Sequence, residues 1–212
     1  MNLNPTLIQD AEERFGIPDV LPLEAELDER DMELVAGSMR RLRVHDVTLF
    51  IVDRGEIAVI RKPMFPPGAY RAPSGGIHAG ETLEEGAQRE GLEETGLALS
   101  LERYVLRIPA RFRPRGPWAG AAGLPTAVAD PDEPSHLRWW THVFLACVRG
   151  ERRLSPRDTR EIAEARWVTV EELQGPIRAT LLATGGGLFR YRVALTDATL
   201  TRLGLWGATA GE

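Results

Sequence analysis

Apolar residues recur along this chain with two different periods, and together they predict a mixed series of strands and helices. The continuous apolar run VTLFIV at 47–52 is followed by IAVIRK at 57–62. Asp53, Arg54 and Gly55 separate the two runs and include residue types that favour tight turns, which predicts a β-hairpin. Further strands are expected at about 101–112, at 139–148 (WWTHVFLACV) and in ARWVTV at 165–170.

Helical spacing of apolar residues predicts helices near both ends of the chain. Residues 5–16 carry apolar side chains close to helical spacing, and a second helical stretch extends from 28 to about 43. A helix is expected to begin at Glu171, and ALTDATLTRLGLW at 194–206 predicts a last one. The triple glycine at 185–187 predicts a loop between them.

One further helix is predicted in the middle of the chain, with a signal at each end. Thr82 is a suitable N-cap, and Glu85 three residues later completes a capping box. Gly96 supplies the glycine that commonly follows the last turn. The helix is therefore expected from about Leu83 to Thr95.

This order of elements predicts an α/β fold in which a mixed central sheet carries helices on both faces. We expect the main domain at 41–212, with a helical extension at 1–40 that is a candidate dimer-forming element. A long loop rich in Pro and Gly is expected at 113–135.

Composition places the chain among globular proteins, with 43% apolar and 27% charged residues among 212. No run approaches the roughly 18–20 apolar residues of a spanning helix, and the start lacks the order of a signal peptide, so no membrane partner is expected. The single cysteine, Cys147, excludes an internal disulfide framework and lies in the apolar run VFLACV, where we expect it to be buried. A lone cysteine fits a reducing cytoplasm.

The formal net charge of −5 argues against binding to a nucleic-acid backbone, which requires an electropositive face. Of the 26 basic residues only Lys62 is a lysine. This preference for arginine over lysine is spread over the whole chain and reflects the base composition of the genome. We therefore draw no functional conclusion from it.

The stretch from Gly75 to Leu97, GGIHAGETLEEGAQREGLEETGL, crowds acidic residues into the last turns of the central helix. With 100° per residue, Glu90 and Glu94 lie about 40° apart, and Glu93 lies about 60° to the other side of Glu90. Like charges on one helical face repel, so folding alone explains them poorly. Three carboxylates on one face are within reach of a single metal cluster, and Arg89 can pair with Glu93.

The specified positions of this stretch resemble the Nudix box, the signature of the Nudix hydrolases. Gly91 departs from the pattern, which has an apolar residue after Arg-Glu. The eight matching positions, spread over 23 residues, are Gly75, Glu81, Arg89, Glu90, Glu93, Glu94, Gly96 and Leu97.

The resemblance implies an α/β/α sandwich, with the box as loop, helix and loop, and a hydrolase dependent on Mg²⁺ or Mn²⁺. It implies that Glu90 and Glu94 are the primary metal ligands and that Glu93 is a ligand or positions a water. By the same resemblance Arg89 orients a glutamate, and the backbone carbonyl at Ser74 or Gly75 is a further ligand. Metals there would activate a water against a phosphoanhydride.

An additional base or ligand from outside the box is expected, because members of this family often use one. Glu161, at the start of EIAEARWV, is the first candidate and Glu164 the second. The alternative for either residue is a solvated surface position.

The group attached to the diphosphate should be recognised by residues outside the box. Arg111, Arg113 and Trp118 lie in an arginine-rich, aromatic stretch next to the long loop and could clamp phosphates and stack a base. Ordinary strand and loop surface is the other explanation. A nucleoside diphosphate linked to another group, of the ADP-ribose or nucleotide-sugar type, is the leading substrate class.

Two other functions and one feature of the helix bear on this interpretation. A Nudix fold without catalysis would act as a sensor of nucleotide derivatives or as an interaction module. An isopentenyl diphosphate isomerase shares the fold and uses a cysteine beside a characteristic motif, which is missing around Cys147. Gly86 and Gly91 should each cost the helix roughly 1 kcal/mol relative to Ala, so either a neighbour packs very closely there or the helix is soft.

Overall fold

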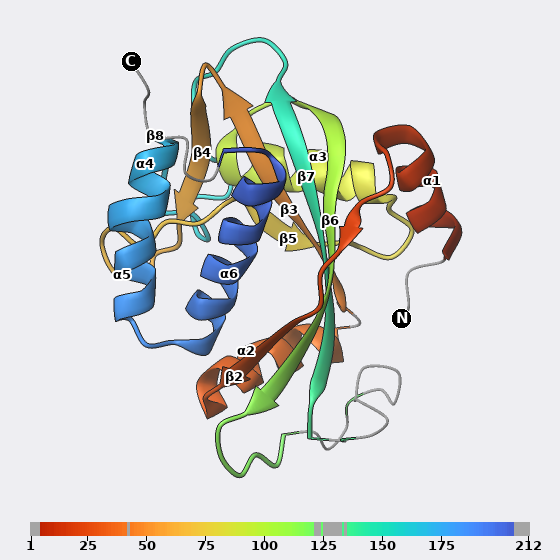
Figure 1. The fold of residues 1–212 in the computed structure, drawn as a ribbon, viewed down its shortest axis with the longest axis vertical. Helices are drawn as coiled ribbons and strands as arrows, with labels where there is room; N and C mark the ends of the chain where they lie inside the picture. The colour runs from red at the N-terminus through yellow and green to blue at the C-terminus, as the bar shows by residue number, and fades with distance from the viewer. Residues whose placement is uncertain (1–4, 42, 121–123, 125–132, 134, 206–212) are drawn as a thin grey trace.

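A mixed eight-stranded sheet runs along the molecule in the order β1-β6-β7-β3-β4-β8, with β2 also paired to β6 and β5 to β3 (Figure 1). The computed structural model describes residues 5–41, 43–120, 124, 133 and 135–205. The strands are β1 (Asp19–Val20), β2 (Leu23–Leu27), β3 (His45–Asp53), β4 (Glu56–Arg61), β5 (Ser74–Gly76), β6 (Leu99–Pro114), β7 (Leu137–Val148) and β8 (Glu164–Thr169).

Strand β3 is central because it pairs with three others. It runs parallel to β7 along one edge, while its other edge pairs antiparallel first with β5 and then with β4. The predicted hairpin between β3 and β4 is confirmed, and its two turn residues, Arg54 and Gly55, have φ angles of 51° and 79°. Positive φ at both positions is the geometry of a two-residue hairpin turn whose twist matches the strands.

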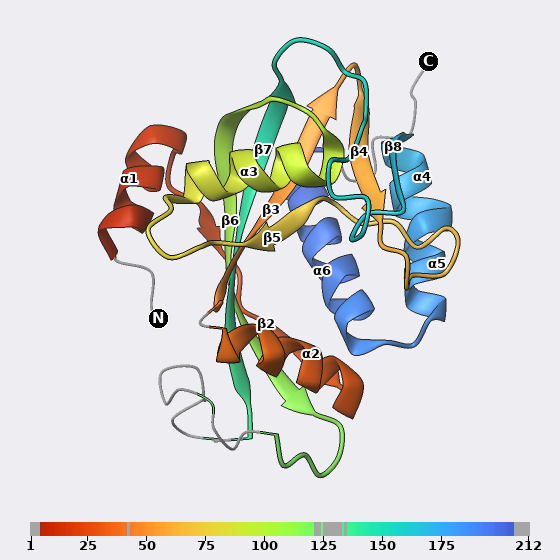
Figure 2. The same cartoon turned by 180° about the vertical axis from the view of Figure 1, so that it is seen from behind.

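Helices cover both faces of the sheet, which confirms the predicted α/β/α arrangement. On one face lie α1 (Pro5–Phe15) and α3 (Leu83–Thr95), as the view from behind shows most clearly (Figure 2). On the other face lie α5 (Arg178–Ala183) and α6 (Gly187–Arg202). The remaining helices are α2 (Glu29–Arg40), α4 (Val170–Glu172) and a π-helical turn at Leu173–Ile177.

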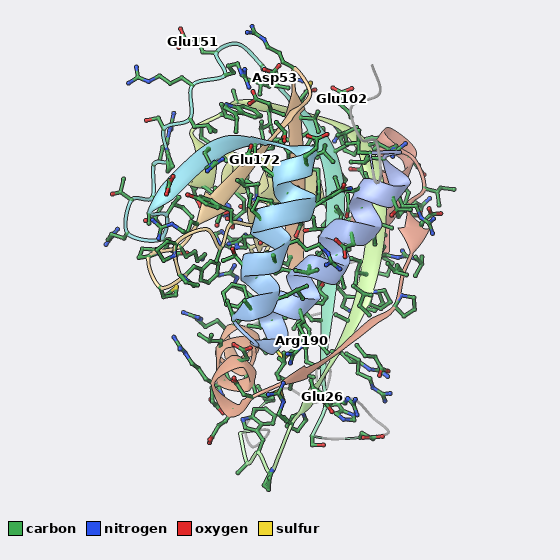
Figure 3. The ribbon with its side chains drawn as sticks, turned by 60° about the vertical axis from the view of Figure 1, so that its left-hand side comes forward. Glu26, Asp53, Glu102, Glu151, Glu172 and Arg190 are labelled. Carbon is green, nitrogen blue, oxygen red and sulfur yellow. The ribbon has the colours of Figure 1, made fainter. Side chains whose placement is uncertain are left out.

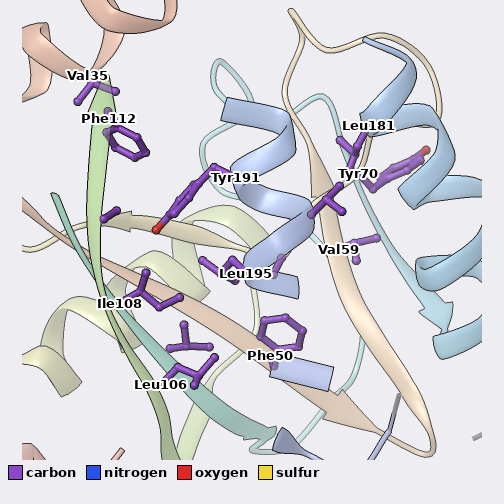
Figure 4. Packing of buried hydrophobic residues seen from close by; sticks show 14 of the residues in the cluster. Val35, Phe50, Val59, Tyr70, Leu106, Ile108, Phe112, Leu181, Tyr191 and Leu195 are labelled. Atoms are coloured by element: carbon purple, nitrogen blue, oxygen red, sulfur yellow. The ribbon is translucent and has the colours of Figure 1, made fainter. Parts of the chain in front are cut away.

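Two clusters of buried apolar side chains fill the space between these layers. The larger one lies on the side of α5 and α6, where Phe50 and Leu106 from the sheet pack with Leu181 and Leu195 from the helices (Figure 4). The smaller one lies beneath α3 and includes Leu49 and Ala87. The alternation of apolar residues along β3 supplies both clusters, since neighbouring side chains point to opposite faces.

The segment expected to be a helical extension, 1–40, contains two helices, α1 and α2, and also two strands that were not expected. Two strands, β1 and β2, lie between its helices and pair parallel with β6. In β2 the residues Leu23, Ala25 and Leu27 are less exposed than the glutamates between them, because the strand has one face toward α6. An alternating segment of only five residues cannot be distinguished from a loop by its sequence pattern.

Three smaller differences concern other parts of the chain. Cys147 is only half-buried, and its Sγ lies 3.0 Å from Glu102 Oε1, so its predicted burial is wrong. The last helix begins at Gly187 rather than 194. Most of the predicted loop at 113–135 lies outside the described residues. Among those described, every helix is too short or too polar to span a membrane.

Candidate active site and metal centre

The residues from which α3 was predicted, Thr82, Glu85 and Gly96, define its two ends in the structure. Thr82 Oγ1 accepts the Glu85 N–H at 3.1 Å, and Glu85 Oε2 accepts the Thr82 N–H at 2.9 Å. Gly96 ends the helix with a φ of 78°, a left-handed conformation that glycine adopts without strain. The predicted bounds, Leu83 and Thr95, are confirmed.

The two glycines inside α3 are explained by close packing rather than by softness. A Cβ at Gly86 would lie 2.4 Å from Ile77 Cδ1, and one at Gly91 would lie 2.3 Å from Leu99 Cδ1. Both distances are too short for a methyl group. The glycines therefore let the helix lie directly on the preceding loop and on β6.

Arg89 is the centre of the polar contacts around the helix. Its guanidinium lies 2.7 and 2.9 Å from the two oxygens of Glu81, 2.6 Å from Glu90 and 3.3 Å from Glu93. It also donates to the carbonyl of Gly76 at 2.8 Å. The predicted pairing with Glu93 is confirmed, but Glu81 is the two-pronged partner, and the Arg89 hydrogen bond lowers the pKa of Glu81 to about 2.

Glu90 is a buried carboxylate pressed against a glycine. Burial raises its pKa to about 7, with the neighbouring Arg89 opposing the shift and Glu94 adding to it. A Cβ at Gly75 would lie only 1.9–2.1 Å from the Glu90 carboxyl atoms. The Glu90 carboxylate thus occupies the space that a side chain at position 75 would fill.

Glu94 is buried where α3 lies against β5. Its Oε1 lies 3.2 Å from Arg71 Nη2, and its Oε2 accepts the Ser74 N–H at 2.6 Å. Burial raises the pKa of Glu94, while the positive charge of Arg71 opposes that shift. Sequence reasoning missed Arg71, because a single basic residue ahead of the box gives no sign that it is buried.

Glu93 differs from the other two glutamates, since its side chain is 46% exposed. Within the part of the chain described, no three or more His, Cys, Asp or Glu side chains are grouped so that they could hold a metal ion. In this structure Glu94 pairs with Arg71, whereas Glu90 and Glu93 both pair with Arg89. That the three carboxylates share one metal cluster stays a prediction.

The segment that carries Glu161 packs on the carboxyl end of α3. The N–H groups of Arg157 and Asp158 donate to the Glu93 carbonyl at 2.9 and 3.1 Å. Glu161 Oε2 lies 2.9 Å from Lys62 Nζ, and this hydrogen bond lowers the pKa of Glu161. The structure thus brings Glu161 close to the box, whereas the second candidate, Glu164, pairs with Arg61 at 3.4 Å.

The predicted substrate-binding residues lie elsewhere. Arg111 and Arg113 sit near the end of β6, at the opposite end of the molecule from α3 (Figures 1 and 2). They pair with Glu24 at 3.8 Å and Glu26 at 3.1 Å, their register partners on β2. Trp118 Nε1 donates to Glu33 Oε1 at 2.9 Å.

These contacts give all three residues a structural role, Arg111 and Arg113 in joining β6 to β2 and Trp118 in holding its loop to Glu33. Arg113 also lines an open surface cavity of about 560 Å³ beside β2 and α6, to which Glu26 and Arg190 contribute (Figure 3). A role in binding a substrate held at α3 stays a prediction.

Comparison with known proteins decides the family. Residues 42–184 match the family model described as NUDIX domain. This chain belongs to the NUDIX domain family.

Two curated relatives resemble this Nudix protein over part of their length. The NAD-capped RNA hydrolase NudC of Chromobacterium violaceum is 41% identical over 70 residues, which are 32% of this chain and 26% of the relative. The RNA pyrophosphohydrolase of Erythrobacter litoralis is 30% identical over 116 residues, 50% of this chain and 62% of the relative. The chain thus spans less than two thirds of either relative.

Solved structures of similar arrangement are more distant in sequence. A UDP-X diphosphatase has a TM-score of 0.45 and is 16% identical in sequence. The match covers 77% of this chain and 71% of the diphosphatase chain. A NUDIX hydrolase from Nitrosomonas europaea has a TM-score of 0.43 and 18% identity, covering 64% and 62%.

The donors around α3 of this Nudix protein fit a hard divalent cation. Glu90 and Glu94 offer carboxylate oxygens, and Mg²⁺ is usually held by one or two carboxylates together with waters and substrate phosphates. The space left by Gly75 brings the Glu90 carboxylate directly against the backbone of β5. Two buried carboxylates with raised pKa are also the kind of group that a cation stabilises.

Proposed function

We propose that this chain is a pyrophosphohydrolase that uses Mg²⁺ or Mn²⁺ to cleave a phosphoanhydride bond by attack of water. The leading substrate is a nucleoside diphosphate linked to another group, of the ADP-ribose or nucleotide-sugar type. The observation that carries the proposal is the pair of buried carboxylates, Glu90 and Glu94, held by Arg89 and Arg71 beside the glycine backbone of β5. Membership of the family supports it.

Each residue of the box has a distinct part in this proposal. Glu90 and Glu94 would hold the cation, with the Gly75 backbone carbonyl as a further ligand, and Arg89 would fix the orientation of Glu90. A bound divalent cation polarises a phosphoryl group and lowers the pKa of an attacking water. Glu93 is the most exposed of the three glutamates and is suited to orienting that water.

Glu161 is the proposed base outside the box. Its segment is hydrogen-bonded to the carboxyl end of α3, and its carboxylate is 64% exposed and paired with Lys62. An ionised, exposed carboxylate next to the metal-binding helix can accept a proton from water.

An RNA carrying a pyrophosphate linkage is the second candidate substrate. The two curated relatives favour it, because both names refer to RNA. This fits poorly with the absence of nucleic-acid binding expected from the net charge of −5. Recognition confined to the end of an RNA would need few contacts with the phosphate backbone. A homodimer and a cytoplasmic location stay predictions.

Hydrolysis of a substrate panel tests both candidates. The panel contains ADP-ribose, nucleotide sugars, NADH, coenzyme A, nucleoside triphosphates, dinucleoside polyphosphates, NAD-capped RNA and 5′-triphosphate RNA, each with Mg²⁺ and with Mn²⁺. Glu94→Gln should lower kcat by more than about 100-fold on the preferred substrate, because the effect of a ligand should exceed that of its supporting residues. Glu13→Gln, an exposed acid on α1, is the matched control.

The outcomes separate the alternatives. Turnover of one class far above the others identifies the substrate. Near-normal kcat of Glu94→Gln would contradict the assignment of α3 as the metal site. Binding of a nucleotide derivative without metal-dependent turnover would favour the non-catalytic sensor.

A further inference from the structure

A row of charges, of which Asp46, Arg71 and Glu94 are buried and Arg192 is partly exposed, connects the last helix of the chain to α3. Arg192 on α6 extends to β3, where its Nη2 lies 3.5 Å from Asp46 Oδ2 and its Nη1 lies 3.4 Å from Thr48 Oγ1. Asp46 is only 4% exposed, so Arg192 is a charged partner for a carboxylate that water scarcely reaches. Helix α6 begins at Gly187, beyond the residues 42–184 that match the family.

Arg71 occupies the middle of this row. It is buried, donates to the Ala72 carbonyl at 2.8 Å and to Ser74 Oγ at 2.7 Å, and pairs with Glu94 at 3.2 Å. Burial lowers the pKa of Arg71, while the negative charges of Glu94 and Asp46 oppose that shift and the positive charge of Arg192 adds to it. Arg71 also lies beside the segment of Asp46, because Thr48 pairs in register with Ser74, whose Oγ accepts from Arg71. The four charges therefore alternate in the order Arg192, Asp46, Arg71, Glu94.

Alternation matters because two carboxylates compete for one guanidinium. With Arg192 in place, Asp46 has its own cation and Arg71 is left to Glu94. Without Arg192, Asp46 would be an unpaired buried charge, which is strongly unfavourable and would draw Arg71 away from Glu94.

We propose that Arg192 is a positioning residue for the metal ligand Glu94, acting through Asp46 and Arg71. This inference rests on the proposed function, since it requires that Glu94 binds the cation. It assigns a role in the active site to α6, a helix outside the family match. Partners of this kind typically change metal affinity by about 10- to 100-fold when they are removed.

The test measures binding of Mn²⁺ alone, through the loss of the free-ion signal in electron paramagnetic resonance. Arg192→Met should weaken Mn²⁺ binding by about 10- to 100-fold. It should lower kcat on the preferred substrate more than it changes KM. Arg178→Met is the control, because it breaks a different and more exposed ion pair of α6, between Arg178 of α5 and Asp197, and should leave Mn²⁺ affinity unchanged.

A double variant separates positioning from simple loss of structure. Asp46→Asn removes the competing charge, so Arg192→Met/Asp46→Asn should recover much of the Mn²⁺ affinity that Arg192→Met loses. Because Arg192 and Asp46 are in contact, their substitutions are coupled in stability as well, so the readout is the Mn²⁺ affinity of the folded variants and not their melting temperature. Circular dichroism and thermal melting check that each variant is folded, and Arg192→Gln, which also removes the charge, replaces the Met variant if that one does not fold.

Failure of this inference differs from failure of the proposed function. If Glu94→Gln abolishes Mn²⁺ binding while Arg192→Met binds as the wild type does, the positioning role is wrong and the metal site stands. If the double variant binds no better than Arg192→Met, competition by Asp46 is wrong. If Glu94→Gln binds Mn²⁺ normally, the metal site and the inference are both wrong.

Discussion

At Gly75 the backbone of β5 lies directly against the carboxylate of Glu90. The Glu90 carboxylate occupies the space that any side chain at position 75 would need, and Arg89 holds it there at 2.6 Å. A glycine in this place thus needs no unusual backbone angle. It is required by the position of a carboxylate.

Gly75→Ala should therefore impair the site more than the fold. The new methyl group meets the end of a side chain, so Glu90 can turn away from it and from Arg89 while the strand stays paired. We expect kcat with Mg²⁺ to fall by about 10- to 100-fold, the scale of lost ligand support. Steady-state hydrolysis and urea unfolding measure the two effects separately.

Gly37→Ala is the matched control for that substitution. Gly37 lies within α2 and a Cβ there would meet nothing within 4 Å. Its activity should equal that of the wild type, and helix propensity should make it slightly more stable. A Gly75→Ala enzyme with unchanged kcat would show that Glu90 does not need its observed position.

At the scale of elements, the end of α3 is held by a loop far along the chain. The Ser155 N–H donates to the Thr95 carbonyl at 2.8 Å, and the next residues cap the Glu93 carbonyl. A Cβ at Gly96 would lie 2.2 Å from the Ser155 carbonyl oxygen, which belongs to the backbone and has little freedom to move. This contact holds the segment of Glu161 on α3.

Gly96→Ala should consequently cost more stability than Gly55→Ala. Both glycines have nearly the same φ, 78° and 79°, but a Cβ at Gly55 would meet nothing within 4 Å. Gly55→Ala should lower the free energy of unfolding by about 1–2 kcal/mol through left-handed strain alone. Urea unfolding of both variants measures the difference, and equal losses would mean that the 155–158 loop is not docked as observed.

Helix α3 could be predicted from the sequence, whereas the short strand β1 could not. Helix α3 was predicted to the residue because Thr82, Glu85 and Gly96 act on backbone groups within a few positions of themselves. The two-residue β1 was not predicted, because it exists only through its pairing with Leu106 and Arg107 of β6. Pairing between distant segments leaves no periodic pattern in so short a stretch.

At the scale of the whole molecule, a buried polar chain crosses three neighbouring strands. His45 Nδ1 lies 3.0 Å from His142 Nε2, and a short hydrogen bond joins Tyr104 Oη to the other nitrogen of His142. Burial lowers the pKa of His45 to about 4, and burial and the neighbouring charges lower that of His142 well below its usual value. Both imidazoles are therefore neutral in the folded protein at pH 7.

Stability should fall as the solution is acidified from about pH 6.5 toward pH 4. In this window the unfolded chain binds protons on these histidines and the folded protein does not, so acid favours unfolding by up to about 1.4 kcal/mol per pH unit for each. Above about pH 6.5 the contribution is fully present. Urea unfolding of His45→Gln between pH 4.5 and 7.5 should give a shallower pH dependence than the wild type.

The exposed His78 provides the control for removing a histidine. His78→Gln should keep the wild-type pH dependence. If His45→Gln keeps it as well, protonation of His45 does not contribute to acid unfolding.

Local sequence patterns were sufficient to predict the class of fold, the β3–β4 hairpin, the length of α3 and the residues of the Nudix box. These features depend on turns, caps and periodic spacing, which act over a few neighbouring residues. Three features came to light only in the folded protein: Glu81 is the main partner of Arg89, Arg71 pairs with Glu94 and Arg192 with Asp46, and Arg111 and Arg113 lie away from α3. Such pairings join residues eight to nearly 150 positions apart, and packing between elements rather than local sequence brings their charges together.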